Sequence, residues 1–161
     1  MKNKMVKDLM THPAITVEDT TKIEEAIKIM KEKNIGFLPI TRNNIITGVV
    51  TDRDILIRGI GIYNTKSEIN NIMTSGEIHF VSLTTSLIDA ATIMATHKIR
   101  RLVVLDDGKV VGVLTSKNLL SEPQLIPFVI ETYNKSKTLN SYDIYSNSNP
   151  HDSIKASDYP L

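Results

Sequence analysis

Several features are absent from this sequence. It has no cysteine and no tryptophan in 161 residues, and aromatic residues make up only 5% of it. Without cysteine there can be no disulfide, thiolate zinc site, iron–sulfur cluster or cysteine nucleophile, and a reducing cytoplasm is the compartment that fits. A dominant charge is also missing, because 19 Lys and Arg residues stand against 18 Asp and Glu residues. The net charge of +1 creates no long-range field and argues against a nucleic-acid partner.

Long apolar runs are missing as well. The densest one, residues 102–105, ends at two aspartates, and no run approaches the ~20 residues needed to cross a bilayer. Residues 1–8 contain no apolar segment of signal-peptide length. We therefore expect no membrane association and a cytoplasmic location. The 41% hydrophobic and 23% charged residues are typical of a globular fold.

The sequence does contain an internal repeat with two copies. The offset between matched positions is 63 residues at the Met-Thr pairs (Met10 and Met73) and 64 residues between Gly48 and Gly112, so one residue has been inserted between them. A unit of about 55 residues is marginally stable alone, which favours packing of the two copies against each other. The matched segments are 6–11 with 69–74, 20–30 with 84–94, 35–40 with 99–104, and 48–54 with 112–118.

Each copy shows the pattern strand, helix, strand, turn, strand, helix. Apolar residues at i, i+3, i+4 and i+7 predict the first helix from Ile23 on, with Thr21 and Glu24 as a capping box. Turn residues at 42–44 and 106–108 split two apolar runs into a hairpin. In the first copy we expect strands at 15–17, 37–41 and 45–50, a second helix opening at 51–54, and a linker at 59–68.

The pattern predicts an α+β fold in which two copies pack sheet to sheet as a pseudo-twofold pair with clefts between them. We place the boundaries at residues 1–61 for the first copy and 62–122 for the second. Residues 123–161 form a C-terminal segment. There the apolar spacing from Leu125 to Tyr133 predicts a helix, and a Ser- and Asn-rich polar tail with Tyr142, Tyr145 and Tyr159 follows.

The segments 6–11 (Val-Lys-Asp-Leu-Met-Thr) and 48–55 (Gly-Val-Val-Thr-Asp-Arg-Asp-Ile) resemble the cystathionine-β-synthase (CBS) domain. The resemblance covers residues 4–122, as a tandem pair of the kind called a Bateman module. The sequence is similar to the stand-alone prokaryotic members of the family. It implies a non-enzymatic regulatory module that senses a small ligand, with adenine nucleotides (AMP, ADP or ATP) first and S-adenosylmethionine as the rival. It also implies a homodimer formed through the helices of the CBS domains and an unknown protein effector.

The resemblance assigns ligand-binding roles to Thr51, Arg53 and Asp54. A hydroxyl and free N–H groups at a helix start bind phosphate, and a carboxylate accepts hydrogen bonds from ribose hydroxyls. The same Thr-x-x-Asp spacing is also that of a helix cap, and the two interpretations are compatible.

The second copy keeps Thr115 but has Asn118 where the pattern has Asp. Asn lacks the charge, so a ribose held there binds less tightly by about 1 kcal/mol. We therefore expect one competent site, anchored by the first copy. Arg100 and Arg101 are either solvated charges on a strand or, as the resemblance implies, phosphate ligands between the copies.

By family position, an adenine slot of the first site is lined by Ile15, Thr16, Ile35, Pro39 and Val49. Each of these residues is equally compatible with ordinary core packing. Proline at position 39 is expected to end or edge a strand and to free a backbone group.

No other motif points to chemistry. His12, His79, His97 and His151 have no metal-ligand spacing, so we expect no metal site. No nucleophile, base and oxyanion donor assemble in the sequence, so we expect no enzyme. The competing function is a ligand-free structural or protein-interaction module, for which the amphipathic C-terminal helix is the main argument.

Overall fold

The computed structural model describes residues 4–134, and the predicted polar tail with its three tyrosines lies outside the described residues. Two three-stranded sheets have the strand orders β1-β2-β3 and β4-β5-β6. In each, the first strand pairs in parallel with the middle strand, and the third pairs antiparallel with it. The predicted α+β repeat is confirmed. Among residues 4–134, no helix has both the length and the apolarity to span a membrane.

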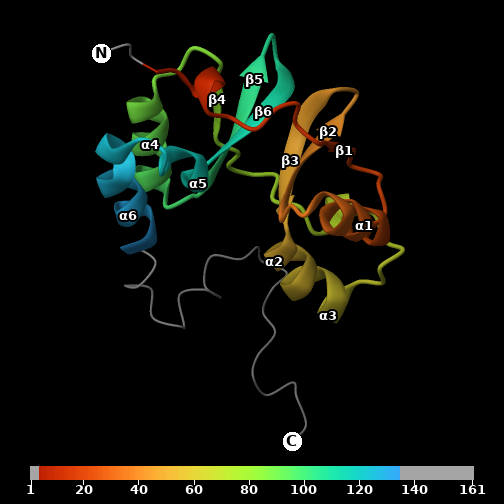
Figure 1. Cartoon of the computed structure of the whole chain (residues 1–161). Coiled ribbons are helices and arrows are strands. Elements are labelled where there is room, and N and C mark those ends of the chain that lie inside the picture. Colours follow the sequence, from red (N-terminus) through yellow and green to blue (C-terminus); the bar gives the residue numbers. More distant parts are fainter. Residues whose placement is uncertain (1–3, 135–161) are drawn as a thin grey trace, which may run out of the picture.

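The two halves use the same elements in the same order (Figure 1). The first half consists of η1 (Val6–Asp8), β1 (Val17–Glu18), α1 (Ile23–Lys33), β2 (Phe37–Arg42), β3 (Ile45–Thr51), α2 (Asp52–Asp54), the π-helical η2 (Ile55–Gly59) and α3 (Ile60–Ile62). The second consists of η3 (Ile69–Asn71), β4 (Phe80–Ser82), α4 (Leu87–His97), β5 (Arg101–Asp106), β6 (Lys109–Thr115), α5 (Ser116–Leu119), η4 (Pro123–Leu125) and α6 (Ile126–Asn134).

Both predicted hairpins are present, and their turns explain the residues found there. Asn43 and Asn44 have φ angles of 54° and 65°, and Asp107 and Gly108 have 47° and 74°. Two successive left-handed residues match the twist of the flanking strands, and Asn, Asp and Gly adopt this conformation at little cost.

The predicted capping box of the first helix is wrong. The N-cap of α1 is Lys22, which makes no side-chain capping bond. Backbone carbonyls of the connection between the repeats replace it: Ser67 O accepts from Ile23 N at 3.0 Å, and Thr65 O accepts from Glu24 N at 2.9 Å. The connection satisfies N–H groups that a side chain would otherwise cap.

The predicted linker at 59–68 also begins too early. The helical segment that opens at α2 continues without a break through η2 and α3 to Ile62. Gly59, which is buried, and Gly61, which is exposed, both lie inside this helical segment. Neither glycine therefore ends it.

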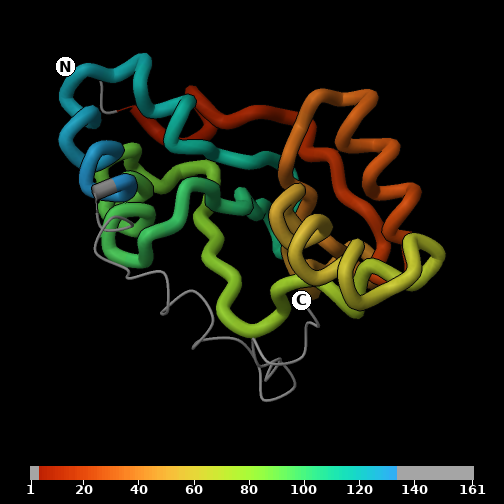
Figure 2. Tube along the Cα trace, turned by 90° about the horizontal axis from the view of Figure 1, so that it is seen from below, coloured from red at the N-terminus to blue at the C-terminus, as the bar shows by residue number. Residues whose placement is uncertain are grey.

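Each half holds the leading segment of the other half. Thr11 pairs with Val113 in β6, and Thr74 pairs with Val49 in β3. Figure 1 shows the red N-terminal segment on the side of β4 and β6 before it crosses to β1, and Figure 2 shows the same crossing from below. The cores follow this exchange. Val6 is buried in the core of the second half, whereas Ile69 of η3 and Ile72 are buried in that of the first.

Two glycines allow this close approach. A Cβ atom on Gly112 would lie 2.5 Å from Met10 Sδ and 3.1 Å from Thr11 O, and one on Gly48 would lie 2.5 Å from Met73 Sδ and 3.0 Å from Thr74 O. The repeated glycine of the sequence pattern therefore marks the contact with the exchanged segment.

The predicted C-terminal helix is present, and its apolar residues divide between two faces. Leu125 and Val129 are buried in the core of the second half, with Thr132 beside them on the buried face. Ile126 and Ile130 are exposed.

Candidate functional site

A cavity of about 520 Å³ lies where the two halves meet. Its wall combines the leading segment of the first half, the start of β2, the start of β5, and the end of β6 with the first turn of α5. The lining residues are Thr11, Pro13, Ala14, Ile15, Asn34, Ile35, Gly36, Phe37, Arg100, Arg101, Val113, Thr115, Ser116, Lys117, Asn118 and Tyr133.

One wall of the cavity is the start of α5. Thr115 Oγ1 accepts from the backbone N–H of Asn118 at 3.2 Å, and Asn118 Oδ1 accepts from Thr115 N at 2.8 Å and from Thr115 Oγ1 at 2.7 Å. This is a complete capping box. Thr51 and Asp54 form the same box at the start of α2, so the capping interpretation of both motifs is confirmed.

Two arginines give the cavity its charge. The guanidinium carbon of Arg101 lies 5.6 Å from the ring centroid of Phe37, and that of Arg100 lies 5.6 Å from the ring centroid of Tyr133. Burial lowers the pKa of Arg101 and the charge of Arg100 lowers it further, against the opposing effect of Asp52. The neighbouring groups therefore compensate only part of the unfavourable free energy of burying Arg101 beside Arg100. An anion in the cavity would offset the rest.

Tyr133 was not predicted to belong to the site. It comes from α6, and its hydroxyl lies 3.4 Å from Ser116 Oγ. This hydrogen bond lowers the pKa of Tyr133, burial opposes the shift, and Arg100 adds to it. In the sequence the residue was only the end of an apolar stripe. The position of α6 against α4 brings it to the cavity, and no local pattern encodes that position.

The structure brings together six of the twelve predicted site residues. The other six are absent from the lining of this cavity. The six that line it are Ile15, Ile35, Arg100, Arg101, Thr115 and Asn118, and the six that do not are Thr16, Pro39, Val49, Thr51, Arg53 and Asp54.

The sequence grouped Ile15 and Ile35 with Asp54, and this grouping stays a prediction. In this cavity these two residues face the Thr115–Asn118 motif of the other half. The exchange of leading segments explains this placement, because Thr11 pairs with Val113 and the chain after it runs along β6, where Ala14 N donates to Val111 O at 3.1 Å.

Asp54 has protein partners of its own. Asp54 Oδ2 accepts from Thr51 N and Oγ1, both at 2.8 Å, and Oδ1 accepts from Arg58 Nη2 at 2.9 Å.

The strand registers relate the halves by 64 residues, since Val17 pairs with Ile40 and Val81 with Val104. This relation places His79 where the first half has Ile15.

Pro39 lies inside β2, the middle strand of its sheet, and not at a strand end as predicted. Its counterpart Val103 donates its N–H to His79 O at 3.3 Å. Proline has no N–H, so the carbonyl of Ile15 receives no such bond from it. For the same reason β1 begins at Val17, later than the predicted start at residue 15. The carbonyl concerned belongs to a residue that lines the cavity.

Although the sequence gives the histidines no metal-ligand spacing, the structure brings His79 and His97 together. Their ring centroids are 4.0 Å apart, and Glu77 lies against both rings. The two histidines are 18 positions apart in the sequence, and only the packing of α4 beside the segment before β4 brings them together.

Comparison with known proteins agrees with the fold and the repeat. Two segments, residues 6–60 and 68–124, match the CBS domain family. The CBS domain-containing protein YhcV of Bacillus subtilis is 34% identical over 115 residues, which cover 71% of this chain and 81% of YhcV. The chain belongs to the CBS domain family and contains two of these domains in tandem.

Solved structures of CBS proteins show what such pairs bind. The CBS domain pair of protein MJ0100, in complex with 5'-methylthioadenosine and S-adenosylmethionine, matches with a TM-score of 0.66 and 30% identity, over 73% of this chain and 94% of that one. CBSX2 in complex with AMP matches with a TM-score of 0.65 and 29% identity, over 76% and 97% of the two chains.

Proposed function

We propose that this protein is a non-catalytic regulatory module that binds an adenosine-type ligand in the cavity between its repeats. The observation that carries the proposal is that one cavity holds a cation pair, the polar side chains at the start of α5 and an apolar wall. These are the parts needed for phosphate, ribose and adenine respectively. The adenosine ligands bound by two related CBS pairs support it.

Among such ligands, we favour AMP, ADP or ATP over S-adenosylmethionine. Arg100 and Arg101 repel each other, and burial lowers the pKa of Arg101. A phosphate accepts hydrogen bonds from both guanidinium groups and removes this repulsion. S-adenosylmethionine has no phosphate and brings a sulfonium cation, which increases the positive charge at the same point.

The ribose would lie at Thr115 and Asn118, and the base against Ile15 and Ile35. The backbone carbonyl of Ile15 receives no hydrogen bond from Pro39. It is an acceptor of the kind an adenine amino group needs. Binding would join residues of both repeats and so bias how the halves pack, which an effector protein can sense.

The proposal is tested by a thermal-shift screen of the full chain against AMP, ADP, ATP, S-adenosylmethionine and NADH. A ligand at about 100 times its dissociation constant adds about 2.7 kcal/mol to the free energy of unfolding, a clear rise in Tm. We expect the adenine nucleotides to give this rise. No shift with any ligand contradicts the proposal and favours a ligand-free interaction module.

Matched arginine variants identify the cavity used. Arg100→Ala is expected to reduce nucleotide affinity strongly, because it removes a charge from the cavity wall. Arg53→Ala removes an exposed arginine from the equivalent helix start of the other half, outside the cavity, and is expected to leave binding unchanged. The reverse result would move the site to Thr51, Arg53 and Asp54.

We also propose a homodimer formed through the helical segments of the repeats. The segment from α2 to α3 exposes a run of apolar side chains: Leu56, Ile57, Ile60, Ile62 and Tyr63. In the second half Ile88 and Leu120 are likewise exposed. Apolar surface gathered on one helical segment is typical of a contact with another chain.

A further inference from the structure

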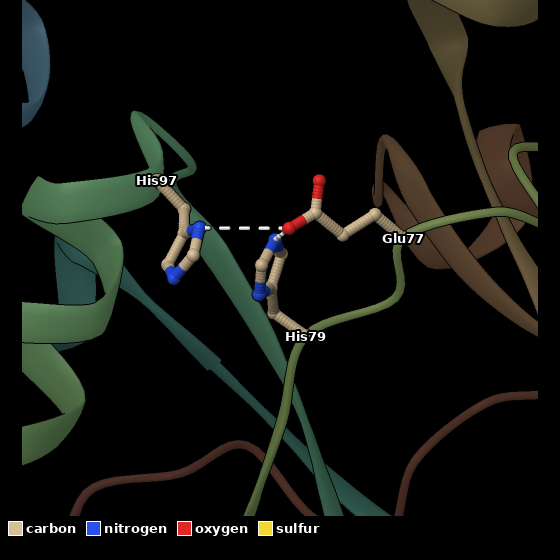
Figure 3. Close-up of side chains that lie close together, drawn as sticks. All are labelled: Glu77, His79 and His97. Atoms are coloured by element: carbon tan, nitrogen blue, oxygen red, sulfur yellow. Dashed lines mark ion pairs between the residues drawn. The ribbon is translucent and has the colours of Figure 1, made fainter.

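Away from the cavity, three side chains able to bind a metal converge on one point. Glu77 and His79 lie on the segment that leads into β4, and His97 is the last residue of α4 (Figure 3). Glu77 Oε1 lies 3.6 Å from His79 Nε2 and 3.8 Å from His97 Nδ1. The three potential ligand atoms all lie within 4.8 Å of one another.

The two distances from Glu77 Oε1 are close to those between ligand atoms of a metal site. Two ligand atoms bound to a tetrahedral zinc ion are about 3.4 Å apart, given zinc–ligand distances near 2.1 Å. The Glu77 side chain is 78% exposed, so a shift of a few tenths of an ångström in it meets little resistance. The two imidazole rings lie 4.0 Å apart at 39° to each other, and each turns one nitrogen toward the same carboxylate oxygen.

The backbone fixes both histidines. His79 O accepts from Val103 N at 3.3 Å, which ties this residue to β5. After His97 the chain turns through Lys98 at φ 56°, and Ile99 N donates to Met94 O at 3.0 Å, which closes the end of α4. Ligands held on ordered elements lose little freedom when a metal binds.

We propose that Glu77, His79 and His97 form a zinc-binding site with one coordination position open to water or to a further ligand. Two imidazoles and one carboxylate suit Zn²⁺, whereas Mg²⁺ and Ca²⁺ prefer sites made of oxygen ligands. The bound ion would fasten the leading segment of the second half to the end of α4. His79 is the counterpart of Ile15, which lines the cavity described above. The zinc site would therefore use, in the second half, the position that lines this cavity in the first half.

The test is isothermal titration of the EDTA-treated, dialysed full chain with zinc chloride, without nucleotide. We expect one equivalent of zinc to bind saturably. Each of Glu77→Gln and His97→Asn is expected to weaken binding by at least about tenfold, the loss that removal even of an outer-shell partner causes. His12→Asn, a change of an exposed histidine outside the cluster, is the matched control and leaves the affinity unchanged.

Two results would overturn the proposal. One is the absence of saturable zinc binding by the wild-type chain, which leaves only a histidine–carboxylate ion pair. The other is wild-type affinity in Glu77→Gln and His97→Asn, which places the metal elsewhere. Glu77 is highly exposed, so its substitution tests the site without loss of fold, and circular dichroism verifies this for both variants. The outcome is independent of nucleotide binding.

Discussion

At the scale of single residues, Asn118 is expected to decide how strongly the proposed ligand is held at its ribose. Its Oδ1 already accepts two hydrogen bonds from Thr115, and an aspartate carboxylate can accept the same two. Asn118→Asp keeps the helix cap and adds a charge for the ribose hydroxyls. We expect nucleotide affinity to rise about fivefold, equivalent to about 1 kcal/mol, in an isothermal titration.

The matched control is Asp54→Asn, the reverse exchange at the equivalent position of the other half. It leaves the cavity unaltered and is expected not to change the affinity there. An unchanged affinity in Asn118→Asp, combined with a loss in Asp54→Asn, would show that the ribose binds at α2.

At the scale of elements, the contact between each leading segment and the opposite sheet depends on a glycine. Gly112→Ala places a methyl group 2.5 Å from Met10 Sδ and 3.1 Å from Thr11 O. The thioether can move, but the carbonyl belongs to a paired backbone segment. We expect the free energy of unfolding, measured by urea denaturation, to fall by about 1–3 kcal/mol.

Gly61→Ala is the control for this substitution. Nothing lies within 4 Å of a Cβ at Gly61, and the residue lies in α3. A glycine in a helix costs about 0.5–1 kcal/mol relative to alanine, so this variant is expected to be as stable as the wild type or slightly more stable. Equal stability of Gly112→Ala and wild type would mean that the leading segment is free to move away.

The elements also show how far the sequence alone leads. The hairpins and both helix starts at Thr51 and Thr115 were predictable because each depends on residues close in sequence, and the repeat was predictable because its two copies can be compared directly. The pairing of Thr11 with Val113 was not, since it joins segments 102 positions apart. The sequence therefore grouped Ile15 with Asp54, whereas Ile15 lines a cavity with Thr115 and Asn118. The replacement of a predicted Thr21 cap by carbonyls of the connection has the same origin.

The candidate sites show the same limit. Arg100, Arg101, Thr115 and Asn118 were found from local motifs and do line one cavity. Tyr133 was missed because its helix reaches the cavity through packing on α4. His79 and His97 were dismissed because no short spacing joins them, although tertiary packing places their rings in contact.

At the scale of the whole molecule, self-association is expected to depend on the exposed apolar side of the helical segment 52–62. Leu56→Glu places a charge there, and burying an unpaired charge in an interface is costly. We expect this variant to be monomeric by size-exclusion chromatography with light scattering, under conditions in which the wild type is dimeric.

Ile45→Glu is the matched control, because Ile45 and Leu56 are equally exposed, at 65% each, and Ile45 lies at the tip of the hairpin. This variant is expected to stay dimeric. A wild type that is monomeric at every concentration, or a Leu56→Glu variant that stays dimeric, would exclude a dimer formed through this segment.

The exchanged leading segments have a consequence for how such a molecule arose. In this chain each core is completed by the leading turn of the other repeat, because Val6 packs in the core of the second half and Ile69 of η3 packs in the core of the first. A chain with a single repeat would lack such a turn from a second repeat. Such an ancestor could complete its core only by lending its first turn to a second copy and receiving one in return. Duplication and fusion of its gene would then turn a swapped dimer into one chain.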